Sequence, residues 1–126
     1  MDIFSNIFKS DRQGVRRSHV KNLISVALAD GHLAREEWDM LVHLAEKFGM
    51  HEHQIKEIKD NADTVQFVAP DTHEESLLQI EDLFMVMTVD HEISPNEVEL
   101  IKKIALKLDV LPQMVDDLIS RLMGDN

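Results

Sequence analysis

The sequence has no cysteine, no tyrosine, one tryptophan, three prolines and four glycines among its 126 residues. Without cysteine, the chain cannot build a disulfide framework or a thiolate zinc site. No apolar run approaches the roughly 20 residues that a membrane-spanning helix requires. The first residues also lack the basic start, apolar stretch and small-residue cleavage site of a signal peptide. We therefore expect a cytoplasmic protein.

Positive charge is also scarce. The chain has 13 lysines and arginines against 24 acidic residues, which gives a net charge of −11. Such a field repels phosphate backbones, so no nucleic-acid partner is expected. The balance is uneven, because residues 1–22 carry five basic and two acidic side chains. The acidic remainder is suited to cations or to a protein partner with a basic surface, and the oligomeric state stays open.

The most informative pattern is an internal repeat. Residues 23–50 align without a gap on residues 83–110, which places Asp30 on Asp90 and Glu37 on Glu97. Each copy reads as an apolar helix, a short acidic turn and a second apolar helix. Because one helix pair cannot bury its apolar face alone, the repeat predicts that the two copies share a core.

Apolar residues recur at helical spacing throughout the chain, and no segment alternates as a strand does. The prediction is an all-α, compact helical domain of about six to seven helices, built from two pseudo-symmetric helix-turn-helix repeats. A single domain, 1–126, would contain repeat one (about 15–61), a linker (about 62–73) and repeat two (about 74–123). The expected helices cover about 15–29, 35–48, 52–61, 74–89, 95–108 and 112–123.

Glycines set several of these boundaries. Gly31 and Gly49 are expected to stop helices in the left-handed conformation, and Gly14 is expected to separate an N-terminal segment from the first helix. Leu28 and Leu122 are among the side chains expected to face the core.

The N-terminal amphipathic segment, about residues 1–12, places four apolar side chains at helical spacing before the basic residues. These are Ile3, Phe4, Ile7 and Phe8. The segment either packs on its own core, which its short length favours, or gives residues 1–21 a peripheral contact with an anionic membrane or a partner.

Helix-entry chemistry explains most of the two acidic turns. Ser94 is expected to cap the helix that begins at Pro95, with Glu97 reaching back as its capping-box partner. The first copy has Ala34 where the cap belongs. Aspartates at turns often accept amide hydrogens of their own turn, and this is predicted for Asp30 and Asp90.

A metal site is the competing interpretation. Packing of the two copies about a pseudo-twofold axis would gather Asp30, Glu37, Asp90 and Glu97 in one region. Several carboxylates held together repel one another unless a proton or a cation neutralises them. Oxygen donors favour Ca²⁺, Mg²⁺ or Mn²⁺. The spacing of these residues does not fit an EF-hand loop.

Two stretches carry a family resemblance: ALADGHLAREEWDMLVHLAEKFGM and VMTVDHEISPNEVELIKKIALKLDV. They resemble the tellurite-resistance TerB-like family, which includes the N-terminal domain of DjlA-type membrane-anchored co-chaperones. The resemblance implies a compact all-α domain with internal pseudo-symmetry and a non-enzymatic role of the stress-response type. The second copy departs from the family's Ala-Asp-Gly turn, with Val89-Asp90-His91 in its place.

The resemblance also implies a divalent-cation site. Matched residue by residue, its acids are Asp30, Glu37, Asp90 and Glu97. The alternative function is an acidic protein-interaction or co-chaperone-like adaptor module without a metal. The sequence contains no glycine-rich phosphate loop, no nucleophile elbow and no catalytic cysteine, so we expect no enzyme.

Overall fold

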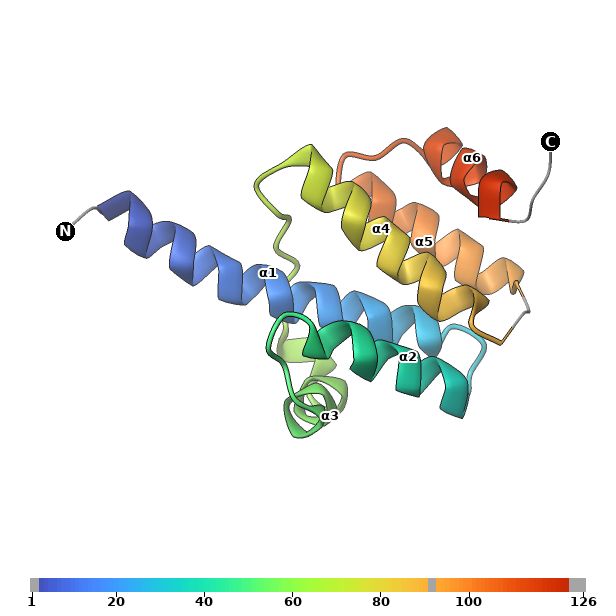
Figure 1. Cartoon of the computed structure of the whole chain (residues 1–126), viewed down its shortest axis with the longest axis horizontal. Helices are drawn as coiled ribbons and strands as arrows, with labels where there is room; N and C mark the ends of the chain where they lie inside the picture. The colour runs from blue at the N-terminus through green and yellow to red at the C-terminus, as the bar shows by residue number, and fades with distance from the viewer. Residues whose placement is uncertain (1–2, 91–92, 123–126) are drawn as a thin grey trace.

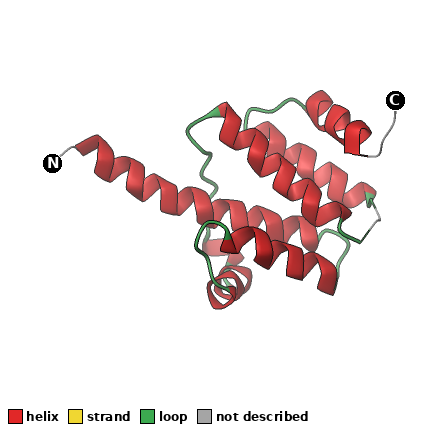
Figure 2. Cartoon of the chain, in the orientation of Figure 1, coloured by secondary structure: helices red, strands yellow, loops and turns green. Residues whose placement is uncertain are grey.

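The computed structural model describes the backbone of residues 3–90 and 93–122, and side chains in these ranges from Arg12 onward. All regular structure in this part of the chain is helical (Figure 2). The helices are α1 (Ile3–Ala27), α2 (Arg35–Glu46), α3 (Glu52–Asp60), the short 3₁₀ helix η1 (Ala62–Thr64), α4 (His73–Thr88), α5 (Pro95–Lys107) and α6 (Pro112–Leu122). The predicted all-α class is confirmed.

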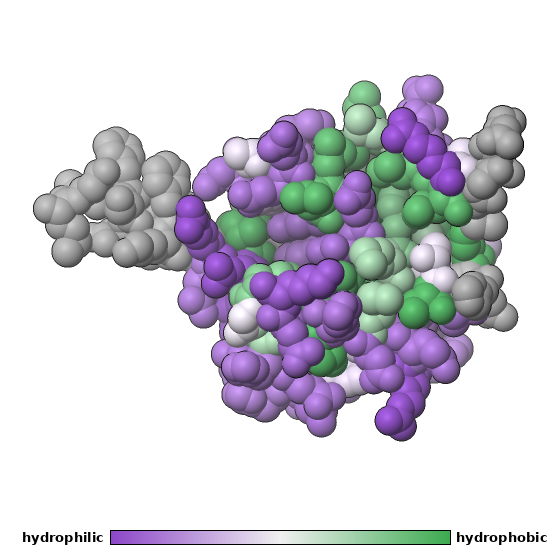
Figure 3. Space-filling view, in the orientation of Figure 1, coloured by the Kyte–Doolittle hydropathy of each residue, from purple (hydrophilic) through white to green (hydrophobic). Residues whose placement is uncertain are grey.

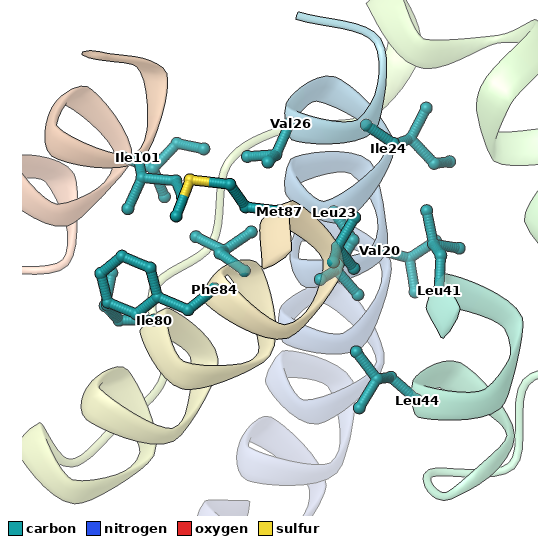
Figure 4. Packing of buried hydrophobic residues seen from close by; sticks show 14 of the residues in the cluster. Val20, Leu23, Ile24, Val26, Leu41, Leu44, Ile80, Phe84, Met87 and Ile101 are labelled. Atoms are coloured by element: carbon teal, nitrogen blue, oxygen red, sulfur yellow. The ribbon is translucent and has the colours of Figure 1, made fainter. Parts of the chain in front are cut away.

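α1 is the central element of the fold. It contacts α2, α3, α4 and α5, while α6 packs on α5 (Figure 1). In the close-up of the core, side chains from α1, α2, α4 and α5 point toward one another (Figure 4). The core side chains with no exposed surface include Val20, Leu23, Leu41, Ile80, Leu83, Met87 and Ile101. The prediction that Leu28 and Leu122 face the core is wrong, because Leu28 is 36% exposed and Leu122 is 56% exposed.

Gly14 does not break the helix, so the predicted boundary there is wrong. α1 runs through it without interruption. A Cβ atom at position 14 would lie 3.3 Å from Cγ2 of Val68 in the linker. One turn further along α1, the Ser18 hydroxyl accepts a hydrogen bond from the Val68 amide at 2.9 Å. The glycine therefore serves the close approach of the linker, and one interior glycine costs a helix only about 1 kcal/mol.

The other predicted helix ends agree with the structure. Gly31 and Gly49 have φ angles of 91° and 84°, in the left-handed region that ends helices. Thr72 caps α4 by accepting the amide hydrogen of Glu75 at 3.1 Å. Each of these signals is local, so each can be read from a few neighbouring residues.

Polar contacts join α1 to the second half of the chain. His19 Nε2 lies 2.9 Å from Asp82 Oδ2, which ties α1 to α4, and the histidine is buried. Lys21 donates from Nζ to the carbonyl oxygen of Val65 in the linker at 2.9 Å. These contacts keep the linker and α4 in register with α1.

The N-terminal end of α1 extends beyond the other helices (Figure 1). The side chains of Ile3, Phe4, Ile7 and Phe8 lie outside the described residues, so neither interpretation of the N-terminal amphipathic segment is tested. None of the described helices is long and apolar enough to cross a membrane. Hydrophilic residues cover much of the face in Figure 3, with apolar surface gathered over the region of α4 and α6.

Candidate functional site: the paired acidic turns

The turn between α1 and α2 lies against the turn between α4 and α5. The Ser94 hydroxyl, at the start of α5, donates to Oδ1 of Asp30 at 2.5 Å. Sixty-four positions of sequence separate these two residues. The contact joins the two acidic turns directly, at the ends of the helices that form the core.

A second contact between the repeats lies one turn further into the helices. Glu37, in the first turn of α2, is hydrogen-bonded to Glu97, in the first turn of α5. Both side chains are buried, with only 5% and 4% of their surface exposed. Two carboxyl groups can hydrogen-bond only if one of them carries a proton. The pair therefore holds a proton between α2 and α5.

The pKa values of both glutamates are raised above the ordinary value. Burial raises the pKa of Glu97 to about 9, with further contributions from the hydrogen bond and the charge of Glu37. Burial also raises the pKa of Glu37, although the hydrogen bond from Glu97 acts in the opposite direction. At neutral pH, the two glutamates therefore share one proton.

The two aspartates complete the cluster. The negative charges of Asp30 and Asp90 raise the pKa of both glutamates. Both aspartates thus lie within electrostatic reach of both glutamates. Of the other titratable residues beside the two turns, Glu36 is exposed, and His91 and Glu92 lie outside the described residues.

Each glutamate of the pair has one buried oxygen that no other residue hydrogen-bonds. Apart from the bond between the two carboxyl groups, Oε2 of Glu37 and Oε2 of Glu97 have no hydrogen-bond partner. A buried carboxylate oxygen without a partner costs about 1–3 kcal/mol or more. However, among residues 3–90 and 93–122 no group of three or more histidine, aspartate or glutamate side chains is arranged ready to hold a metal ion.

Helix capping accounts for part of this arrangement. Ser94 Oγ accepts the amide hydrogens of Asn96 and Glu97 at 3.2 and 3.4 Å, as predicted. The predicted role of Glu97 as capping-box partner is wrong, because its carboxyl group contacts Glu37 in the other repeat. The predicted contact of Asp30 with amides of its own turn is replaced by the bond to Ser94. α2 has no side-chain cap at Ala34.

Ser94 is the site residue that sequence reasoning missed. It was recognised as a cap of its own helix, but not as the partner of Asp30. The available signal was the repeat itself, which aligns Asp30 with Asp90 and Ala34 with Ser94 and so relates the two turns. Capping rules treat one helix at a time and contain no such information.

The comparison with protein families gives one match. The family model described as tellurite resistance protein TerB matches residues 1–60. This range includes α1, α2 and α3 and therefore Asp30 and Glu37. Searches of curated proteins and of solved structures gave no match. The match over residues 1–60 supports the TerB-like resemblance identified from the sequence.

Proposed function

We propose that this TerB-like chain is a non-enzymatic, cytoplasmic stress-response domain of the tellurite-resistance type, in which the paired acidic turns bind a divalent cation. The supporting observation is the buried Glu37–Glu97 pair, whose two Oε2 atoms have no partner outside the pair. Asp30 and Asp90 add negative charge to the same region. A cation placed there would satisfy the unpartnered oxygens and neutralise four mutually repelling carboxylates.

The donor set defines the class of cation. Carboxylate and hydroxyl oxygens favour hard ions, so Ca²⁺, Mg²⁺ and Mn²⁺ are the candidates. The chain's own residues would contribute as follows. Glu37 and Glu97 would supply buried oxygens. Asp30 would give up its hydrogen bond with the Ser94 hydroxyl and bind the ion instead, and Asp90 would contribute negative charge from the second turn. Because ligands must be deprotonated, binding releases the proton that the two glutamates share.

Calorimetric titration tests the proposal. The chelator-treated protein is titrated with Ca²⁺, Mg²⁺, Mn²⁺ and Zn²⁺, and its thermal unfolding is followed with and without each ion. At least one of the oxygen-preferring ions is expected to give saturable heat and to raise the melting temperature, because ligands that bind only the folded state stabilise it. The double variant Asp30→Asn/Asp90→Asn should lose both effects.

The matched control is Glu36→Gln/Glu99→Gln. It also removes two negative charges, but from exposed positions on α2 and α5. This variant should bind the ion as the unchanged protein does. The proposal is wrong if none of the four ions gives heat or a thermal shift. It is also wrong if binding is undiminished in the Asp30/Asp90 variant.

One observation favours the adaptor alternative. The Glu37–Glu97 pair is already neutralised in part by its own proton, and Ser94 already bonds Asp30. The acids would then join the two repeats, while the acidic surface binds a partner with a basic surface. Such binding should weaken as salt increases and should be indifferent to chelator. A cation-free domain that binds a basic peptide in this way would support the adaptor function.

A further inference from the structure

A surface pocket lies between the start of α2 and the end of α3, and neither the family match nor the acidic turns explain it. Its volume is about 370 Å³, within the range of about 300–1,000 Å³ typical of small-molecule sites. The lining residues are Leu33, Arg35, Trp38, Lys56, Lys59 and Asp60. We call it the α2–α3 pocket.

The charge of this pocket is opposite to that of the protein. Three of its six lining residues are basic and one is acidic, although the chain as a whole has a net charge of −11. In an acidic protein, basic side chains usually form ion pairs with the abundant carboxylates. In the described part of the chain, Lys56 and Lys59 make none.

Arg35 is only weakly engaged. Its Nε lies 3.8 Å from Oδ2 of Asp39, and the two side chains are 88% and 66% exposed. An exposed pair of this length contributes little. The positive charge at the pocket is therefore available to a ligand.

Trp38 supplies a flat apolar wall with a fixed orientation. Its Nε1 donates to Oε2 of Glu52 at 2.9 Å. Glu52, Lys56 and Lys59 follow one another at helical spacing on the same face of α3. The hydrogen bond holds the indole along this face, so the ring and the two ammonium groups border the same pocket. Leu33 adds a second apolar contact.

We propose that the α2–α3 pocket binds a small phosphorylated molecule that carries a planar ring, with a nucleoside monophosphate as the simplest representative. The phosphate contacts Arg35, Lys56 and Lys59, and the ring stacks on Trp38. Stacking on an aromatic side chain is sequence-tolerant for nucleobases, and basic side chains form strong charge-assisted hydrogen bonds with phosphate.

The size of the ligand follows from the surrounding field. A nucleic-acid strand would carry its charge across the acidic surface, where it is repelled. A single phosphate stays within the Debye length of the three basic residues, about 8 Å at physiological ionic strength. The pocket therefore favours a small anion over a polymer.

The chain provides its own probe for this test. Trp38 is the only tryptophan and there is no tyrosine, so the intrinsic fluorescence reports directly on this pocket. The intact protein is titrated with adenosine monophosphate in the presence of chelator, and calorimetry repeats the titration. We expect saturable quenching of Trp38 that weakens as salt increases.

The variant Lys56→Gln/Lys59→Gln removes two of the three cations and should raise the dissociation constant at least about tenfold, as lost charge-assisted contacts do. The matched control is Lys47→Gln/Lys103→Gln, which makes the same charge change at exposed lysines outside the pocket. The control should bind like the unchanged protein. Equal weakening by both variants would overturn the proposal, since it would show a general charge effect.

Two further ligands separate the parts of the proposal. Adenosine without phosphate and inorganic phosphate without the ring should each bind at least about tenfold more weakly than the monophosphate, because each lacks one of the two contacts. Adenosine that binds as tightly as the monophosphate would refute phosphate recognition. Inorganic phosphate that binds as tightly would refute the stacking role of Trp38. An absence of saturable binding of the monophosphate would overturn the proposal as a whole.

Discussion

Glu97 combines burial with direct contact to a second carboxyl group, and together these raise its pKa from 4.5 to about 9. In the unfolded chain both influences disappear, so the unfolded state releases this proton near the ordinary value of 4.5. Between pH 4.5 and 9 the folded state therefore binds more protons than the unfolded state. Under that condition stability falls as pH rises, by at most about 1.4 kcal/mol per pH unit for one proton.

The substitution Glu97→Gln should remove most of this dependence. Glutamine keeps a donor for the Glu37 carboxylate and cannot ionise. The variant is expected to be more stable than the unchanged protein at pH 8, by about 1 kcal/mol or more, and the two should converge toward pH 5. Urea unfolding of chelator-treated protein across this range measures the effect. Parallel pH profiles for the two proteins would contradict it.

At the scale of the helices, α2 and α5 occupy corresponding places in the two repeats but begin differently. α5 has Ser94 as its cap, whereas α2 has Ala34 and no side-chain cap. Ala34 has φ −69° and ψ 144°, the extended conformation that capping residues adopt. The backbone at this position already suits a cap that the side chain does not provide.

We therefore expect Ala34→Ser to stabilise the protein by about 0.5–1 kcal/mol, because the hydroxyl can accept a free amide hydrogen of the first turn of α2. The reverse change in the other repeat, Ser94→Ala, should destabilise by about 1–2 kcal/mol. It removes the cap of α5 and also leaves Asp30 without its donor. Urea unfolding of both variants compares the two helices. A destabilising Ala34→Ser would show that the open end of α2 has another role.

For the molecule as a whole, the net charge of −11 predicts a response to salt. Like charges on a compact molecule repel one another, and added salt screens them, since the Debye length falls from about 8 Å at physiological ionic strength to about 3 Å at 1 M. The melting temperature should rise by about 4 °C over this range, equivalent to about 1 kcal/mol. Circular dichroism in potassium chloride measures it.

The variant Glu36→Gln/Glu99→Gln serves as the control for the salt response. It reduces the net negative charge at exposed positions and should show a smaller rise in melting temperature. A melting temperature that falls with salt in the unchanged protein would mean that attractive ion pairs, such as Lys102–Asp116 at 2.9 Å, outweigh the repulsion.

Local signals in the sequence predicted much of this fold. Pro95 marks a helix start, Gly31 and Gly49 mark helix ends, and each acts on its immediate neighbours. Gly14 was misread because its role depends on Val68, which reaches it only in the folded chain. The candidate site, too, could be predicted from the sequence only in part. The repeat indicated which acids gather, but the bonds Asp30–Ser94 and Glu37–Glu97 join residues that no single-helix rule relates.

The central position of α1 has a consequence for biosynthesis. α1 is translated before α4 and α5, against which it packs, and α5 ends only at Lys107. Ribosomes add about 5–20 residues per second, so several seconds pass between the synthesis of α1 and that of α5. During this interval the nascent chain presents Val20, Leu23 and Ile24 to the solvent and to any chaperone near the ribosome exit. The core around α1 is thus completed only after α5 has been translated.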